Sequence, residues 1–227
     1  MKVEVGESLA YSWLKHVKKC QLIQINWKFS PVWGFNNAAV KGTVKAAKNY
    51  FKSDKTDFEN YAIFGANGKS TDSQIIQQTE CDVIGYDFKA KKIYAVESAF
   101  HRDGLLYQNP EHTGNKVASK LIRSAICFLA LNPKCRGELY FLAPTASPKV
   151  LKIVNGVIDD VNDFFSQNGL KFKAFFYCGI SFKEKVLNPI VDISEEVADT
   201  SELFLRGIQL CQKFDETAAK TGSRKKK

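Results

Sequence analysis

The sequence predicts an α/β protein in which a mixed central β-sheet is flanked by helices. Segments with helical and with strand periodicity alternate along the chain, and only one pair of strands is joined by a short turn that forces an antiparallel hairpin. The chain has 227 residues, of which 44% are hydrophobic and 25% charged. This composition is typical of a compact globular protein and excludes a disordered or collagen-like chain.

The first half of the chain alternates between the two patterns. Leu9, Trp13 and Val17 share one face of an amphipathic helix, and Ser30 with Pro31 ends the strand that follows it. The elements expected here are a helix over 7–20, a strand over 21–29, a helix over 37–51 and a small strand over 61–64.

The second half contains the clearest local unit, two strand-like segments joined by the polar turn 87–92. Asn132 and Pro133 stop the helix that follows, and Thr200 to Glu202 are capping residues for the last helix. The expected elements are strands over 80–86 and 93–100, a helix over 114–131, a strand over 137–142, a helix over 148–167, a strand over 172–178 that stays extended through 193, and a helix from 200 to about 214.

Composition and charge bound the class of protein. We expect one domain over 1–220 with an insertion at about 30–75, and a basic disordered tail over 221–227. The net charge is +9, of which the last four residues contribute +4, so the body stays basic and a nucleic-acid partner is favoured. The six cysteines show no zinc-ligand spacing, and no segment is typical of a membrane helix or a signal peptide. These features predict a cytoplasmic protein with no membrane partner.

Two carboxylates of the predicted hairpin are the main chemical signal. Glu97 interrupts an apolar strand, and a lone buried carboxylate is costly unless it has a partner, a proton or a metal. Alternation places Glu97 on one face with Ala99 and, if the strand continues, His101. If Asp82 of the partner strand shares that face, the two carboxylates meet across the hairpin and form a site for Mg²⁺ or Mn²⁺. The alternative is a solvated face or strand end.

A helix, a strand, a hairpin bearing Asp82 and then Glu97, a helix and a strand together resemble the PD-(D/E)XK restriction-endonuclease-like superfamily, over residues 7–145. The resemblance implies a restriction-endonuclease-like fold and a nuclease in which Asp82, Glu97 and the backbone carbonyl of Ser98 hold the metal. Glu7 matches the acidic residue of the first helix that many members use as a further metal ligand, although a role near the helix N-terminus is an equal alternative.

The chain departs from the family at one position. Ala99 stands where the family has a lysine, two residues after Glu97. Some members supply this cation from the next helix, where Lys116, Lys120 and Arg123 fall within about 60° of one another. Lys120 or Lys116 is therefore the candidate catalytic cation, with Arg123 and His101 as further nucleic-acid contacts. The alternatives are a solvated helix face and a structural histidine.

These residues predict a Mg²⁺- or Mn²⁺-dependent endonuclease that hydrolyses phosphodiester bonds in DNA. Family members that cut both strands act as dimers, which predicts a homodimer. Two alternatives stay open: a nuclease-like nucleic-acid-binding protein that has lost catalysis, and an α/β interaction protein whose charge only keeps it soluble.

Overall fold

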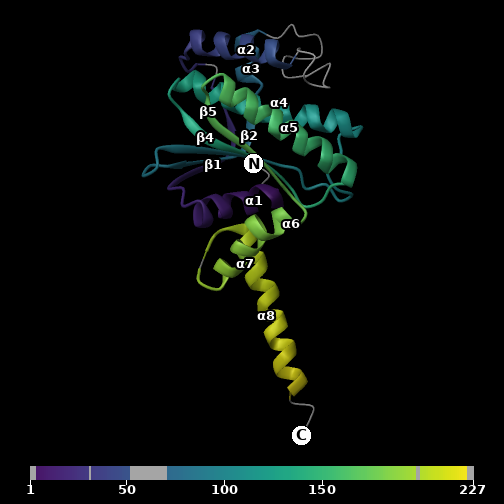
Figure 1. Cartoon of the computed structure of the whole chain (residues 1–227). Helices are drawn as coiled ribbons and strands as arrows, with labels where there is room; N and C mark the ends of the chain where they lie inside the picture. Colours follow the sequence, from purple (N-terminus) through teal and green to yellow (C-terminus); the bar gives the residue numbers. More distant parts are fainter. Residues whose placement is uncertain (1–3, 31, 52–70, 198–199, 224–227) are drawn as a thin grey trace.

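The structure, a computed structural model, describes residues 4–30, 32–51, 71–197 and 200–223 (Figure 1). Five strands form one sheet in the order β1-β2-β3-β4-β5. Their bounds are β1 Leu22–Lys28, β2 Glu80–Asp87, β3 Lys92–Ser98, β4 Arg136–Ala143 and β5 Lys171–Cys178. β1, β2 and β3 pair antiparallel, whereas β3, β4 and β5 pair parallel. The predicted α/β class with a mixed sheet is confirmed.

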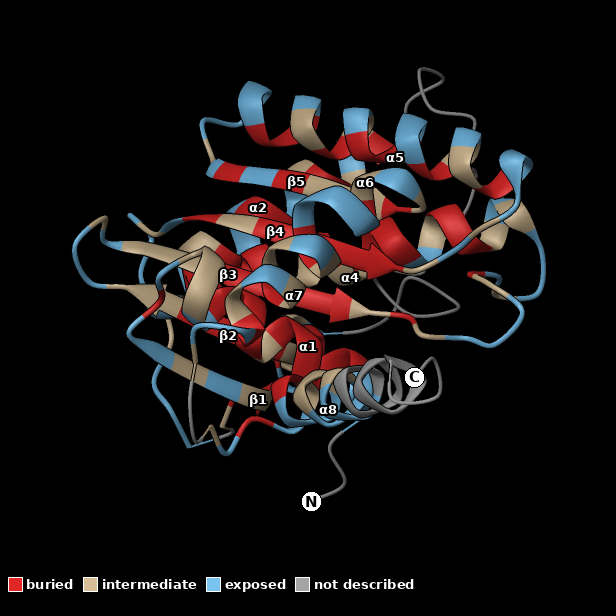
Figure 2. Ribbon diagram, turned by 90° about the horizontal axis from the view of Figure 1, so that it is seen from below, coloured by how far each residue is buried: buried red, intermediate tan, exposed pale blue. Residues whose placement is uncertain are grey.

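Helices cover both faces of the sheet (Figures 1 and 2). One layer contains α2 Asn37–Phe51, α3 Asp72–Gln77, α4 Pro110–Leu131 and α5 Pro148–Gln167. Its core includes Phe128, Phe141 and Phe164, each at most 1% exposed. The other layer, built around Trp13 and Tyr140, contains α1 Val5–Ser12, the π-helical turns η1 Trp13–Val17 and η3 Lys183–Leu187, and the short helices α6 Ile180–Phe182 and α7 Asn188–Ser194.

The helices α4 and α5, which connect the parallel strands β3, β4 and β5, have clear start signals in the sequence. The Asn109 side chain caps α4 by accepting a 2.7 Å hydrogen bond from the backbone N–H of His112, and Pro110 occupies the first turn. α4 therefore begins four residues before the predicted Gly114. Ser147 caps α5 in the same way, and the predicted bounds of that helix are confirmed.

Two element predictions are wrong. The first helix does not continue regularly to Cys20, because it changes into the π-helical turn η1 and the chain then turns at Lys19, where φ is +59°. The extended segment predicted beyond 178 is helical instead, and its helix spacing buries Val186 and Ile190 against the second core. The strand predicted over 61–64 and the end of the predicted tail, 224–227, lie outside the described residues.

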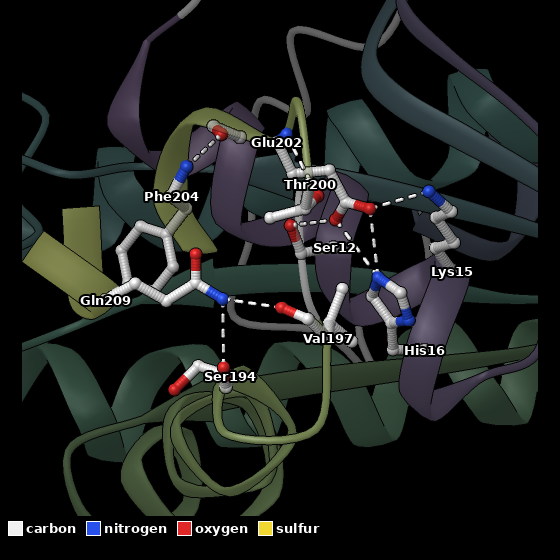
Figure 3. A network of polar contacts seen from close by, with 10 residues as sticks. Ser12, Lys15, His16, Ser194, Val197, Thr200, Glu202, Phe204 and Gln209 are labelled. Carbon is white, nitrogen blue, oxygen red and sulfur yellow. Dashed lines mark hydrogen bonds and ion pairs between the residues drawn. The ribbon is translucent and has the colours of Figure 1, made fainter. Parts of the chain in front are cut away.

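The last helix, α8 Leu203–Ser223, extends away from the body and is longer than predicted (Figure 1). Its base is held by the buried carboxylate of Glu202, which accepts hydrogen bonds from Ser12 Oγ and Lys15 Nζ, both at 2.6 Å, and lies 2.9 Å from His16 Nε2 (Figure 3). Over the described ranges, no helix combines the length and apolarity needed to cross a membrane.

Candidate functional site

The strands β2 and β3 separate at the position of the two predicted carboxylates. Their pairing runs from the turn as far as Val83 opposite Val96, and the next step of the register places Asp82 opposite Glu97. There the Asp82 side chain replaces the backbone hydrogen bonds between the strands. Its Oδ2 accepts hydrogen bonds from the backbone N–H of Ser98 at 2.7 Å and from Ser98 Oγ at 3.2 Å. The hairpin therefore brings the two carboxylates together, and Ser98 fixes the orientation of Asp82.

Glu97 is buried to 1% exposure although it carries a carboxylate. Its Oε2 accepts a hydrogen bond from Lys120 Nζ, an ion pair that reaches from α4 across to β3. Its Oε1 is buried and has no hydrogen-bond partner among the described residues. Burial raises the pKa of Glu97 to about 7, against the opposing effect of Lys120. One oxygen of the Glu97 carboxylate is therefore stabilised by Lys120, and the other has neither a hydrogen bond nor an ion pair with a described residue.

Lys120 stays charged at this position. Burial alone lowers the pKa of its ammonium group, but the negative charges of Glu97 and Asp82 outweigh that effect and raise the pKa above its ordinary value. Of the cations predicted on α4, the structure brings Lys120 to Glu97. Because its pKa is raised, Lys120 acts as a fixed positive charge and not as a proton acceptor near neutral pH.

A pocket of about 430 Å³ opens beside this pair. The end of α3 and the start of β2 supply one wall, formed by Gln78, Thr79, Glu80 and Asp82. The other wall is one side of α4, with His112, Asn115, Lys116, Ser119, Lys120 and Arg123. The pocket is therefore polar, with cations mainly on the helix and carboxylates on the strand.

The remaining predicted cations differ in their placement. Lys116 and Arg123 both line the pocket, and Lys116 Nζ lies 3.9 Å from the centre of the Tyr107 ring. His101 does not line it. β3 ends at Ser98, so the alternation of the strand does not extend to His101, which is exposed and packs edge-on against Tyr107 at 5.5 Å between ring centres.

Glu7 approaches the site from α1. Its Oε2 accepts hydrogen bonds from the backbone N–H of Glu4 at 3.2 Å and from Asn26 Nδ2 at 3.5 Å. Burial raises the pKa of Glu7, and the negative charge of Asp82 raises it further. Glu7 is thus both part of the N-terminal cap of α1 and close enough to Asp82 to interact with it, so both predicted roles are compatible with its position.

Asn26 is a residue of the site that sequence reasoning missed. It lies inside β1 at the position facing Asp82, and its φ is +53°, a left-handed conformation that is uncommon for residues other than glycine. Asn26 interrupts the alternation of β1, so that Ile25 packs in one core and Trp27 in the other. Its amide then reaches Glu7. No pattern in the sequence signals this change of face.

The site offers a divalent cation two carboxylates, Asp82 and Glu97. No group of three or more His, Cys, Asp and Glu side chains that could hold a metal occurs in the described part of the chain. Mg²⁺, however, keeps several waters and binds proteins through only one or two carboxylates together with substrate phosphates. Asp82 and Glu97, with the unpartnered Oε1 of Glu97, fit that smaller requirement.

Comparison with known proteins adds no assignment: no family model, no curated protein and no solved structure matches the chain. The fold and the geometry of the site are therefore the basis for a functional proposal.

Proposed function

We propose that the chain is a metal-dependent nuclease that hydrolyses phosphodiester bonds in DNA, with Asp82 and Glu97 as the ligands of Mg²⁺ or Mn²⁺. Glu97 is the main support, because it is buried beside a polar pocket with one oxygen paired to Lys120 and the other unpartnered. The element order and the separated hairpin strands also agree with the PD-(D/E)XK resemblance of residues 7–145.

Each residue of the site has a separate role in the proposed reaction. A bound divalent cation lowers the pKa of a coordinated water and neutralises charge on the phosphate. Ser98 orients the Asp82 carboxylate, and Asn26 with the backbone of Glu4 holds Glu7 next to it. Lys120 supplies a fixed positive charge for the phosphate, in place of the lysine that Ala99 replaces. Lys116 and Arg123 extend the positive wall along the pocket.

One observation favours a second candidate function. Lys120 pairs directly with Glu97, so the site partly neutralises itself without a metal. The same geometry suits a nuclease-like protein that binds nucleic acid through the cations of α4 without cutting it. Both candidates include the DNA partner; the cytoplasmic location and the homodimer stay predictions from the sequence and the family.

The two candidates are separated by incubating the protein with supercoiled plasmid in Mg²⁺, Mn²⁺ or EDTA. We expect nicking that requires the metal and is lost in Asp82→Asn and Glu97→Gln, whereas Glu184→Gln, an exposed carboxylate on η3, leaves it unchanged. DNA retention without nicking in any metal supports the binding protein instead. Cutting that survives both site variants refutes the assignment of the metal ligands.

A further inference from the structure

A second buried polar atom without a partner belongs to a residue that lines the pocket beside Lys120, and the proposed chemistry does not use it. Asn115 lines the pocket from α4, and its Oδ1 is buried with no hydrogen-bond partner among the described residues. A buried acceptor without a donor costs free energy, and such atoms in folded proteins are normally satisfied by protein, water or a ligand. Asn115 lines the pocket, so a turn of its amide about χ2 on ligand binding would bring this oxygen to the ligand.

The lining of the pocket indicates the chemistry of that ligand. Lys116 and Lys120 supply donors to the lining, Asp82 supplies acceptors, and Asn115 contributes an amide, which has both a donor and an acceptor. A phosphodiester group offers only acceptors, so it pairs with the lysines and leaves the Asn115 oxygen unpartnered. A nucleobase edge offers a donor and an acceptor side by side, which an asparagine amide pairs with through two hydrogen bonds.

Size agrees with this chemistry. The pocket volume of about 430 Å³ lies within the range of about 300–1,000 Å³ that small-molecule sites occupy. None of the described residues that line it is Phe, Tyr or Trp, and His112 is the one aromatic ring among them, so base recognition here relies mainly on hydrogen bonds. Asp82, one of the two proposed metal ligands, and Lys120, the partner of the other, both line the pocket, which places a bound nucleotide next to the proposed scissile position.

We propose that this pocket receives one unpaired nucleotide, with its base at Asn115 and its phosphate at Lys116 and Lys120. In a continuous duplex the bases are stacked and their Watson–Crick edges are paired, so a whole base enters such a pocket only after it has left the stack. The preferred substrate is therefore a nucleic acid with an unpaired nucleotide at the site, such as a single strand. This preference rests on the proposed nuclease function, but binding of the nucleotide itself does not.

Nucleotide binding is measured by calorimetric titration of the metal-free protein in EDTA with dAMP, deoxyribose 5-phosphate and inorganic phosphate. A paired amide–base contact is worth about tenfold or more in affinity, so we expect dAMP to bind at least about tenfold more tightly than deoxyribose 5-phosphate. In Asn115→Ala that difference disappears while phosphate binding is retained. Asn155→Ala, an exposed asparagine of α5, is the matched control and keeps the difference.

Unfolding in urea tests whether Asn115 has only a structural role. Since its buried oxygen bonds to no described residue, Asn115→Ala is expected to unfold at the same denaturant concentration as the unmodified protein or at a higher one. A clear loss of stability, or equal affinities for dAMP and deoxyribose 5-phosphate, overturns the proposal.

The two proposals fail in distinguishable ways. Selective dAMP binding that depends on Asn115, in a protein that cuts no plasmid or oligonucleotide, supports the nucleotide pocket and refutes the nuclease. If the protein does cut, we expect a single strand to be cut faster than a duplex of the same sequence, with the difference reduced in Asn115→Ala. Faster cutting of the duplex refutes the pocket proposal even where the nuclease is established.

Discussion

The ion pair between Lys120 and Glu97 makes a prediction about stability that needs no substrate. Glu97 is 1% exposed, so replacing Lys120 by methionine leaves a buried carboxylate without its cation. Removing one partner of a fully buried pair costs about 3–5 kcal/mol. The Lys120 side chain is 32% exposed, which weakens the pair through solvent screening, so we expect Lys120→Met to lower the free energy of unfolding by about 2–3 kcal/mol at pH 8.

The second variant completes a double-mutant cycle. Glu97→Gln removes a buried charge that the folded state disfavours and leaves a lysine that still reaches solvent, so we expect a change of less than about 1 kcal/mol, in either direction. In the double variant neither charge is left uncompensated. Its loss should therefore be smaller than the sum of the single losses by about 1–2 kcal/mol. Urea unfolding followed by tryptophan fluorescence is a suitable assay, because Trp13 and Trp27 are buried in the two cores.

The loss of stability caused by Lys120→Met also depends on pH. The pKa of Glu97 is raised in the folded state from 4.5 to about 7, so the folded protein binds more protons than the unfolded chain between these values. Stability from this group therefore falls as the pH rises through that window. Loss of Lys120 removes the opposing effect and extends the window upward, so Lys120→Met costs less at pH 5 than at pH 8.

A surface pair provides the control for this cycle. Lys149 and Glu111 lie 3.0 Å apart with side chains that are 66% and 58% exposed, and Lys149→Met should change stability by no more than about 0.5 kcal/mol. Additive losses in the cycle, or a Lys120→Met effect at pH 8 no larger than that control, would refute the account of Glu97 as a buried and half-compensated charge.

Two further predictions concern the sheet and the base of α8. A Cβ at Gly137 would clash with the carbonyl oxygen of Ile93 on β3, so Gly137→Ala should lower the free energy of unfolding in urea by about 1–3 kcal/mol. Gly156→Ala in α5, where nothing lies within 4 Å, should instead raise it by up to about 1 kcal/mol. Equal effects of the two substitutions would show that β3 and β4 are not packed this closely at Gly137. Although burial by itself raises the pKa of Glu202, hydrogen bonds from its partners hold that pKa below its ordinary value of 4.5. The stability that Glu202 provides is therefore present above pH 4.5 and is lost as the pH falls through the folded pKa. Glu202→Gln should therefore flatten the acid limb of a stability–pH curve, and an unchanged limb would show that Glu202 adds nothing to it.

The sequence predicted those elements in which local and tertiary preferences agree. α5 has a capping serine, a first-turn proline and a regular apolar stripe, and its bounds were predicted correctly. The segment after β5 has no such agreement, because its apolar residues are compatible with either an extended or a helical chain. The choice is made by packing, which buries Val186 and Ile190 in the same core as Trp13 of η1.

The candidate site shows the same division. Glu97 is conspicuous in the sequence because a charge inside an apolar strand has to be compensated, and helical spacing placed Lys120 on a face with Lys116. Asn26 was not predictable, because its role depends on a left-handed φ inside a strand and on a contact with Glu7 across two elements. Asn115 lies one turn before Ser119 on α4, but only the folded structure shows that its oxygen is buried without a partner.

Stability and function make opposite demands on Glu97, which is why the two sets of measurements belong together. A buried ion pair whose role is structural is in general replaceable by apolar residues at little or no cost, because the desolvation of both charges is removed with them. The Glu97–Lys120 pair is less favourable than such a pair, since one carboxylate oxygen has no partner among the described residues. The double variant Glu97→Gln/Lys120→Met tests this distinction. If it is nearly as stable as the unmodified protein but has lost metal-dependent cutting, the two charges are needed to bind a ligand in the pocket and are not needed to stabilise the fold.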